Sequence, residues 1–233
     1  MSDPFGRAIR EFHRGEQDEP LRQRDGDDVI EHPIEAFYFG DYEGHPFFDD
    51  HLRGPMLDVG CGVGQHALSY QECFEAVGIE VSEHLVETAR ERGVTDARLG
   101  DMFSLSAQFE RDRFASILCF GTQLGLGGSL GGVAEILREF AYVTDDEGTA
   151  AVHLYDPEQG DPTGLQGYRP RPEPGLAHRV FHFEYEDEVG ETLVFLMLSP
   201  DRLREAAIGT GWEVEEIERM EEGSAYYAAL EKQ

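Results

Sequence analysis

Long apolar segments are missing from this chain of 233 residues. It has no run of about 18 apolar residues, so we expect no membrane-spanning helix. Residues 1–4 are not a basic region followed by an apolar one, so we also expect no signal peptide and a cytoplasmic protein. The length suits one domain, with room for a small appendage.

Cysteine is scarce, and neither it nor histidine forms a metal-binding pattern. Cys61, Cys73 and Cys119 have no metal or redox spacing, and each lies in or beside an apolar stretch. We therefore expect buried free thiols in a reducing compartment. The nine histidines are scattered without an H-E-x-x-H motif, so no metal site is expected.

Lysine is nearly absent, and Lys232 is its only instance. Lys and Arg total 19 against 48 Asp and Glu, which gives a formal net charge of −29. Such self-repulsion destabilises a compact state in dilute salt and is screened at high salt. The pattern resembles cytoplasmic proteins of extreme halophiles, and we interpret the acid excess as adaptation to salt. An acidic mesophilic protein is the alternative, but it would rarely replace nearly all of its lysines.

A glycine-rich turn follows an apolar stretch at residues 56–59. Gly60, Gly62 and Gly64 are spaced as G-x-G-x-G, and a helical pattern begins soon afterwards. Glycine lets backbone N–H groups approach a ligand closely, so this corner predicts a nucleotide-like cofactor. The dinucleotide fingerprint requires a further glycine at position 65, where this chain has Gln65. An NAD-dependent oxidoreductase is therefore the less favoured alternative.

An acidic residue ends the next predicted strand, residues 74–79. Glu80 comes 22 positions after Asp58, close to the roughly 20-residue offset at which an acid meets ribose hydroxyls. A carboxylate can accept hydrogen bonds from both hydroxyls. Ser82 then caps a helix that is expected to continue to about Arg92.

Two further segments fit the same pattern. A short strand at residues 97–99 leads into Gly100-Asp101-Met102, and residues 114–120 are the most apolar strand of the chain. Such a strand is expected at the centre of a parallel sheet. Six glycines within residues 121–132 follow it, where ligands bind beyond the carboxyl ends of strands.

Taken in order, the acid before the first glycine, Glu80 and Asp101 resemble the motifs of class I S-adenosylmethionine-dependent methyltransferases. The resemblance covers roughly residues 55–156 and implies S-adenosylmethionine as cofactor. It also implies an α/β fold: a Rossmann-like mixed sheet of about seven strands, the last antiparallel, with helices on both faces and an N-terminal helical cap. The cofactor-binding residues that it implies are Asp58, Gly60, Cys61, Gly62, Gly64, Glu80, Val81, Asp101, Met102 and Phe120.

The resemblance also suggests how the chain is divided. Residues 1–50 would form the cap and 51–233 the methyltransferase domain, with a substrate-covering insertion at about 156–186. In the cap, Arg7, Arg10 and Arg14 share one helical face, which favours a solvated helix over a phosphate-contacting arm. The substrate-side candidates are Tyr38, Tyr42, Thr122, His153 and Tyr155. No catalytic residue is assigned.

The expected function is methyl transfer by in-line displacement to the oxygen or nitrogen of a small-molecule acceptor. The [DN]-P-P-[FY] signature of base-amino methyltransferases is missing, so DNA is not expected as a partner. An RNA-directed or non-catalytic member of the same fold is the main alternative, because fold does not fix function. The oligomeric state is not indicated.

Overall fold

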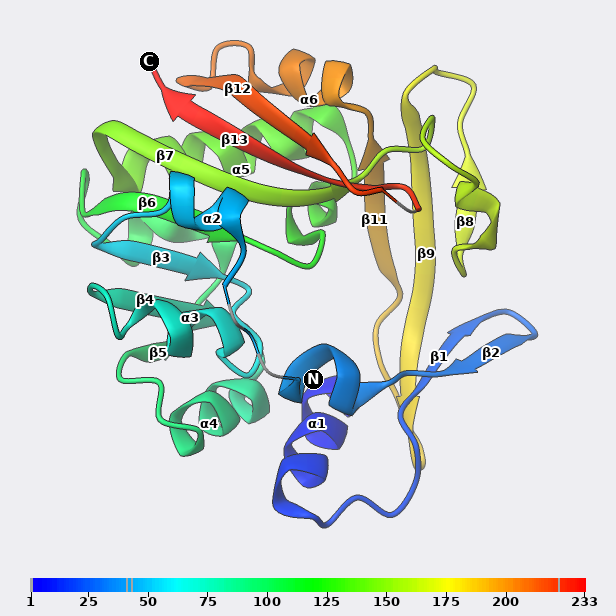
Figure 1. Cartoon of the computed structure of the whole chain (residues 1–233). Coiled ribbons are helices and arrows are strands. Elements are labelled where there is room, and N and C mark those ends of the chain that lie inside the picture. The colour runs from blue at the N-terminus through cyan, green and yellow to red at the C-terminus, as the bar shows by residue number, and fades with distance from the viewer. Residues whose placement is uncertain (1, 41, 43, 222) are drawn as a thin grey trace.

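Seven strands form a mixed sheet at the centre of the molecule (Figure 1). The computed structural model describes residues 2–40, 42, 44–221 and 223–233. The strands lie in the order β12 (Trp212–Arg219), β13 (Ala225–Lys232), β7 (Thr144–Tyr155), β6 (Phe114–Cys119), β3 (Met56–Val59), β4 (Ala76–Glu80) and β5 (Ala97–Leu99). Strands β3 to β7 are parallel, whereas β13 runs antiparallel to β7 and to β12. The expected sheet with an antiparallel last strand is confirmed.

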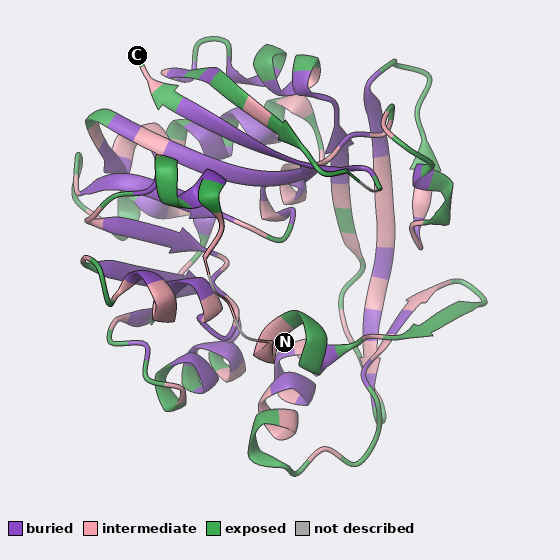
Figure 2. Cartoon of the chain, viewed as in Figure 1, coloured by how far each residue is buried: buried purple, intermediate pink, exposed green. Residues whose placement is uncertain are grey.

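Helices cover both faces of this sheet. One face packs against α2 (Pro46–His51), α3 (Gln65–Tyr70) and α4 (Glu83–Glu91), and the other against α5 (Leu130–Val143) and α6 (Pro200–Ala207). Strands β3, β4 and β6 are buried along their whole length, as Figure 2 shows, because helices lie on both sides of them. Ser82 caps α4 by accepting a hydrogen bond from the Leu85 amide at 3.2 Å, as its sequence position predicts.

A second sheet lies beside the first and is built around the long strand β9 (Leu176–Tyr185) (Figure 1). Strands β1, β8, β10 and β11 pair with β9, and β2 pairs with β1. The other bounds are β1 (Arg22–Asp25), β2 (Asp28–Glu31), β8 (Tyr168–Pro170), β10 (Glu188–Val189) and β11 (Leu193–Leu198). Short helical turns complete the chain: η1 (Glu35–Phe39), η2 (Met102–Ala107), η3 (Gln123–Gly127) and η4 (Pro162–Gly164).

The N-terminal segment is not wholly helical, which corrects the expected helical cap. After α1 (Pro4–Arg14), the β1–β2 hairpin joins the second sheet, and the π-helical turn η1 follows it. Gly26-Asp27 forms the two-residue turn between Asp25 and Asp28, with Gly26 at φ +59°. That dipeptide between two strand-length segments is a hairpin signal that outweighs the helical pattern around it.

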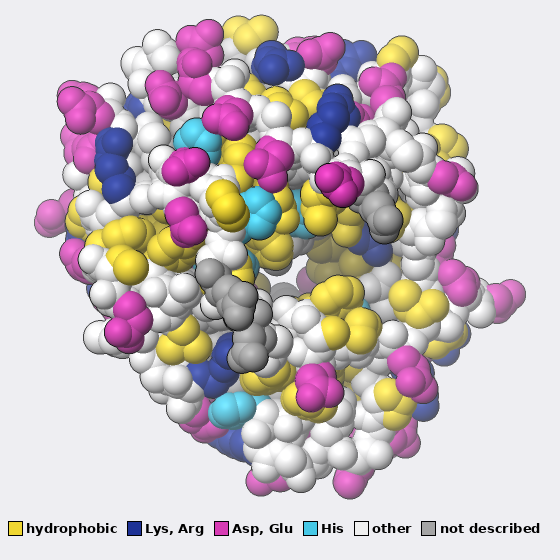
Figure 3. Space-filling view, viewed as in Figure 1, with side chains coloured by type: hydrophobic (Ala, Val, Ile, Leu, Met, Phe, Trp, Pro, Cys, Tyr) yellow, Lys and Arg dark blue, Asp and Glu magenta, His cyan; other side chains and the backbone are white. Residues whose placement is uncertain are grey.

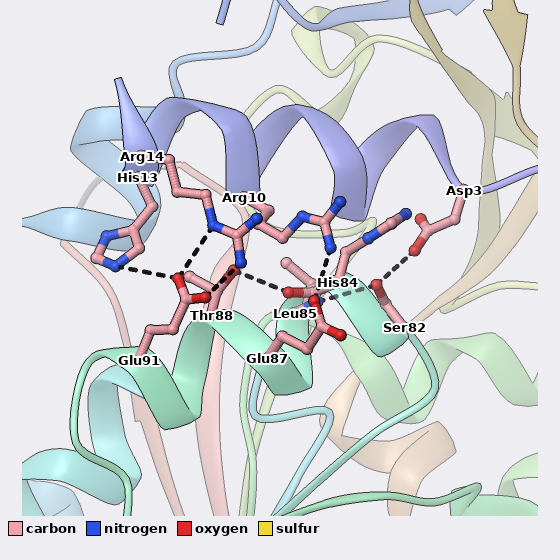
Figure 4. Close-up of polar contacts among 10 residues, drawn as sticks. All are labelled: Asp3, Arg10, His13, Arg14, Ser82, His84, Leu85, Glu87, Thr88 and Glu91. Atoms are coloured by element: carbon pink, nitrogen blue, oxygen red, sulfur yellow. Dashed lines mark hydrogen bonds and ion pairs between the residues drawn. The ribbon is translucent and has the colours of Figure 1, made fainter. Parts of the chain in front are cut away.

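Helix α1 is attached to α4 by polar contacts (Figure 4). Arg10 Nη1 donates to Glu87 Oε2 at 2.6 Å, and Arg14 pairs with Glu91. At the other end of α1, the Ser82 hydroxyl donates to the Asp3 carboxylate, which also accepts from the Gly6 amide at 2.9 Å. The expectation of a solvated arginine face is therefore wrong, because these arginines contact carboxylates of neighbouring elements.

Two of the three cysteines are buried. Cys61 and Cys119 are buried as expected, but Cys73 is exposed because it lies in the turn after α3 rather than in a strand.

Across the residues that the structure describes, no helix combines the length and hydropathy needed to cross a bilayer.

Candidate cofactor and substrate site

The three glycines of the turn between β3 and α3 have different surroundings. All have positive φ: +68° at Gly60, +55° at Gly62 and +77° at Gly64. A Cβ at Gly64 would lie 2.3 Å from Val94 Cγ2, so that glycine permits close packing of α3 on its neighbour. A Cβ at Gly62 would meet nothing within 4 Å. The Gly62 backbone therefore borders open space that a ligand could approach.

Cys61 points back into the sheet rather than toward this space. A Cβ on Gly78 in β4 would lie 2.8 Å from Cys61 Sγ, so the thiol occupies room that glycine leaves free. Burial raises the pKa of the Cys61 thiol well above its usual range, which keeps it protonated and unreactive. Its position within the turn is thus a packing position.

Glu80 ends β4 with its carboxylate buried beneath the glycine-rich turn. Its Oε2 accepts the Gly62 amide at 3.2 Å, and its Oε1 accepts the amides of Val81 at 2.8 Å and Ser82 at 3.1 Å. Burial raises the pKa of Glu80, and these three amides act in the opposite direction by stabilising the ionised form. The structure thus joins Glu80 to the glycine turn, and its role toward ribose hydroxyls stays a prediction.

Asp58 lies in β3 directly before the turn and is 1% exposed. Its Oδ2 is buried and has no hydrogen-bond partner among the described residues. The pKa of Asp58 is raised to about 7, mainly by burial. The negative charge of Glu80 acts in the same direction, and the Ala67 amide acts against both. An unpartnered buried carboxylate oxygen is costly unless a donor reaches it.

The segment after β5 brings apolar surface to the same edge of the sheet. The Gly100 amide donates to the Glu80 carbonyl at 3.0 Å, which places Asp101 next to that residue. Met102 is buried, but Val81 is 69% and Phe103 is 47% exposed. These apolar side chains lie at the carboxyl ends of β4 and β5, where a planar ring could cover them.

A group of rings lies at the carboxyl ends of β6 and β7. The Phe120 ring stacks on His153 at 4.8 Å and 20°, and His66 from α3 lies 4.6 Å from Phe120 on a tilted plane. Tyr227 and Tyr155 lie 5.4 and 5.7 Å from His153. We call Phe120, His66, His153, Tyr155 and Tyr227 the ring group.

The two histidines of the ring group are neutral at physiological pH. Burial lowers the pKa of both His66 and His153 to about 4. His153 Nδ1 is buried without a partner in the part of the chain that the structure describes. The ring group therefore offers aromatic faces and, in His153 Nδ1, a buried imidazole nitrogen without a partner among the described residues, but no fixed positive charge.

The other substrate-side candidates lie in three places. Thr122 is buried just beyond the ring group and adopts φ +64°, a strained conformation for a β-branched residue. Tyr42 lies beside His66 at 4.7 Å. Tyr38 lies apart from both: its hydroxyl is 3.0 Å from His32 Nε2, and burial and the Glu80 charge both raise its pKa. Tyr38 thus lies near Glu80 rather than in the ring group.

Figure 3 shows a deep hollow between the central sheet and the part that carries α1 and β9, with apolar and histidine side chains around it. The sequence did not reveal two residues of this region, His66 and Arg179. His66 follows the glycine turn without any spacing signal, and only the fold places it against Phe120. Arg179 belongs to β9, which the sequence places over the substrate without singling out that side chain.

The order of the central sheet, its glycine-rich first turn and the acid ending the next strand define an α/β protein that binds a nucleotide-like cofactor at the carboxyl ends of its strands. Residues 56–148 match the family model described as a methyltransferase domain. A crystal structure of an S-adenosylmethionine-dependent methyltransferase from Bacteroides fragilis in complex with S-adenosyl-L-homocysteine is similar over 98% of this chain and 94% of that one, with 26% identity and a TM-score of 0.80.

More distant structures share the fold alone. The CcbJ methyltransferase from Streptomyces caelestis has 16% identity and a TM-score of 0.57 over 76% of this chain and 83% of that one. The sugar N-methyltransferase KedS8 from Streptoalloteichus has 18% identity and a TM-score of 0.54 over 74% and 78%. No protein of curated function matches the sequence.

These matches confirm the enzyme class that the sequence predicted. The chain is an S-adenosylmethionine-dependent methyltransferase with a Rossmann-like fold. The class requires a methyl acceptor.

Proposed function

We propose that this chain methylates an oxygen or nitrogen atom of a small-molecule acceptor, which binds in the hollow of Figure 3. The observation that carries the proposal is the buried, unpartnered Oδ2 of Asp58 beside the open backbone of Gly62. A cationic ammonium such as that of the cofactor's amino-acid end would satisfy this oxygen. The remaining residues of the glycine-rich turn would border the same ligand.

The other cofactor contacts follow from the same geometry. Glu80 would accept from ribose hydroxyls, because its ionised carboxylate has more acceptor positions than the three amides use. Val81, Asp101 and Met102 would surround the adenine, and Phe120 would separate the cofactor from the acceptor. When bound, S-adenosylmethionine supplies an electrophilic methyl group, whose transfer discharges the sulfonium.

The ring group, together with Tyr42 and Thr122, would hold the acceptor. Its aromatic faces exclude water and limit rotation of the acceptor, which promotes reaction through proximity. His153 Nδ1 is a free hydrogen-bonding atom at this position. Because the pKa of His153 is lowered to about 4, the imidazole can accept a proton from a hydroxyl nucleophile or from a protonated amine only transiently.

A small acceptor is favoured over RNA by the arrangement of the arginines. Arg7, Arg10 and Arg14 of the N-terminal helix are paired with carboxylates and are not free to contact phosphates. On the face that Figure 3 shows, acidic side chains are more frequent than basic ones, and they repel a polyanion. We also infer that the acid excess adapts the chain to a salt-rich cytoplasm.

Thermal melting in molar KCl tests the cofactor half of this proposal. S-adenosylhomocysteine should raise the melting temperature with concentration by mass action, whereas NAD should not. A shift with NAD alone would overturn the proposal. Release of S-adenosylhomocysteine, measured with small hydroxyl and amine compounds in one set of reactions and with structured RNA in another, tests the acceptor. Turnover with RNA only would favour the RNA-directed alternative.

A further inference from the structure

Among the described residues, Arg179 has no acidic partner, unlike most arginines of this chain. Arginines such as Arg10, Arg24 and Arg219 lie within 4.0 Å of a carboxylate. Within the described residues, no carboxylate lies at that distance from Arg179. Asp and Glu outnumber Lys and Arg by 48 to 19, so an arginine without a carboxylate beside it in the described part of the chain is unusual here.

Other arginines without a carboxylate have ordinary explanations. Arg90 and Arg92 donate to backbone carbonyls, the former to Ala97 and the latter to Tyr38 and Val63. Arg111 and Arg138 are exposed to solvent. Neither explanation covers Arg179, which is only partly exposed and has most of its donors unused.

The position of Arg179 directs it to the acceptor side of the hollow. Strand β9 alternates its side chains, so Arg179 shares a face with Phe181 and Phe183, which pack in one cluster with Val63 of the glycine turn. Its guanidinium carbon lies 5.0 Å from the Phe181 ring centre and 5.6 Å from that of Tyr155. Because Tyr155 belongs to the ring group, Arg179 connects the second sheet to the acceptor position.

The donors of Arg179 are largely unused. Nε donates to the Gln166 carbonyl at 3.2 Å, and neither Nη atom has a hydrogen-bond partner or is enclosed, as far as the described residues show. Burial lowers the pKa of Arg179, and the charge of Tyr155 acts in the opposite direction. A partly desolvated cation without a counter-charge is unfavourable, and an incoming anion would relieve it.

We propose that Arg179 binds a carboxylate of the methyl acceptor, so that the substrates of this enzyme are small carboxylic acids. The inference rests on the proposed function, which places the acceptor in the hollow. A guanidinium presents two parallel N–H donors that match a carboxylate, and the Tyr155 and Phe181 rings fix its plane. A single arginine suits a monoanion better than a phosphate dianion. The acid end would lie at Arg179 and the nucleophile toward Phe120 and His153.

Binding of matched acids and amides to the full chain, saturated with S-adenosylhomocysteine, tests this proposal. The probes are benzoate and benzamide, 4-hydroxyphenylacetate and its amide, and indole-3-acetate and its amide, measured by calorimetry. At least one acid should bind about tenfold or more tightly than its amide, as a charge-assisted pair predicts. Arg179→Gln should abolish this preference and Arg179→Lys should keep part of it. Arg171→Gln, an exposed arginine paired with Glu173, should leave it intact.

The outcomes separate this inference from the proposed function. If S-adenosylhomocysteine binds but no acid is preferred over its amide, the acidic acceptor is overturned and the methyltransferase proposal stands. If Arg179→Gln instead weakens S-adenosylhomocysteine binding, the carboxylate is that of the cofactor and the inference fails. Circular dichroism and the melting temperature of each variant show whether it is folded. Failure of the wild-type chain to bind S-adenosylhomocysteine would overturn the proposed function itself.

Discussion

The Gly62 amide donates to Glu80 Oε2 at 3.2 Å and so connects the glycine-rich turn after β3 to the end of β4. Gly62 has φ +55°, which directs its amide toward that carboxylate, and a side chain there would be strained. The contact brings the two cofactor motifs of the sequence into one structure. It also orders the turn before any ligand binds.

Glu80→Ala should weaken binding of S-adenosylhomocysteine by well over tenfold. The change removes a charged acceptor that we expect to bind the ribose, and such hydrogen bonds are worth about 1.5–3 kcal/mol. Calorimetry measures the dissociation constant. Glu80→Gln keeps the shape and one acceptor and should have a smaller effect. Glu83→Ala, an exposed neighbour in α4, is the control, and equal losses in it and Glu80→Ala would remove Glu80 from the site.

The sequence predicted the parts of the site that follow from spacing along the chain. Asp58, the glycines and Glu80 occupy consecutive strand ends, so alternation of strand and helix brings them together. Their roles toward the cofactor stay predictions. The sequence missed the β1–β2 hairpin, because the charged residues around Asp25-Gly26 resemble a solvated helix as much as an edge hairpin.

The sequence could not predict contacts between distant segments. His66 of α3 and His153 of β7 both contact the Phe120 ring that follows β6, and no local pattern encodes this arrangement. The surroundings of Arg179, which has no carboxylate beside it among the described residues, likewise depend on how distant segments pack. Such features follow from tertiary packing and are found only in the folded chain.

Affinity for S-adenosylhomocysteine should fall as the pH drops below about 7, because Asp58 must be ionised to pair with the ligand ammonium. Burial raises the pKa of Asp58 to about 7, so the free protein takes up a proton there as the solution becomes acidic. Binding must then release that proton, which weakens affinity by up to about tenfold per pH unit. Calorimetry between pH 5.5 and 8.5 measures this slope.

The control for this pH profile is Asp58→Asn, which cannot ionise. It should bind more weakly at pH 8 and lose the slope near pH 7. An unchanged slope in Asp58→Asn would assign the proton to another group, such as Glu80, whose pKa burial also raises.

His153→Gln should make the free energy of unfolding less dependent on pH between 4 and 6.5. Burial lowers the pKa of His153 to about 4, whereas an unfolded histidine titrates near 6.5. Between these values the unfolded state binds more protons, so stability from this group is complete above pH 6.5 and is lost as pH falls toward 4. The loss is about 1.4 kcal/mol per pH unit. Urea unfolding of both proteins at pH 5 and 7.5 measures the difference, and parallel profiles would contradict it.

Asp3→Ala should release the N-terminal helix and destabilise the protein by about 1–2 kcal/mol. The carboxylate of Asp3 caps α1 at Gly6 and accepts from Ser82, the cap of α4, so its loss affects both helix starts (Figure 4). Hydrogen exchange should become faster across α1. Asp161→Ala, which removes an exposed cap within η4 alone, should leave exchange in α1 unchanged. Equal exchange in the Asp3 variant and the wild type would show that α1 is held by its apolar contacts.

Added KCl should raise the melting temperature over the molar range, although it also weakens ion pairs. The structure has exposed pairs, such as Arg98 with Asp96 and Arg204 with Asp201, that salt screens, and each of them contributes little. The excess of acids over cations is 48 minus 19, or 29, and their mutual repulsion is screened by the same salt. Because the repelling charges are so numerous, relief of repulsion should outweigh the lost pairs. Melting in KCl, with an equal osmolality of glycerol as control, measures this balance. A melting temperature that is highest in dilute buffer would contradict adaptation to salt.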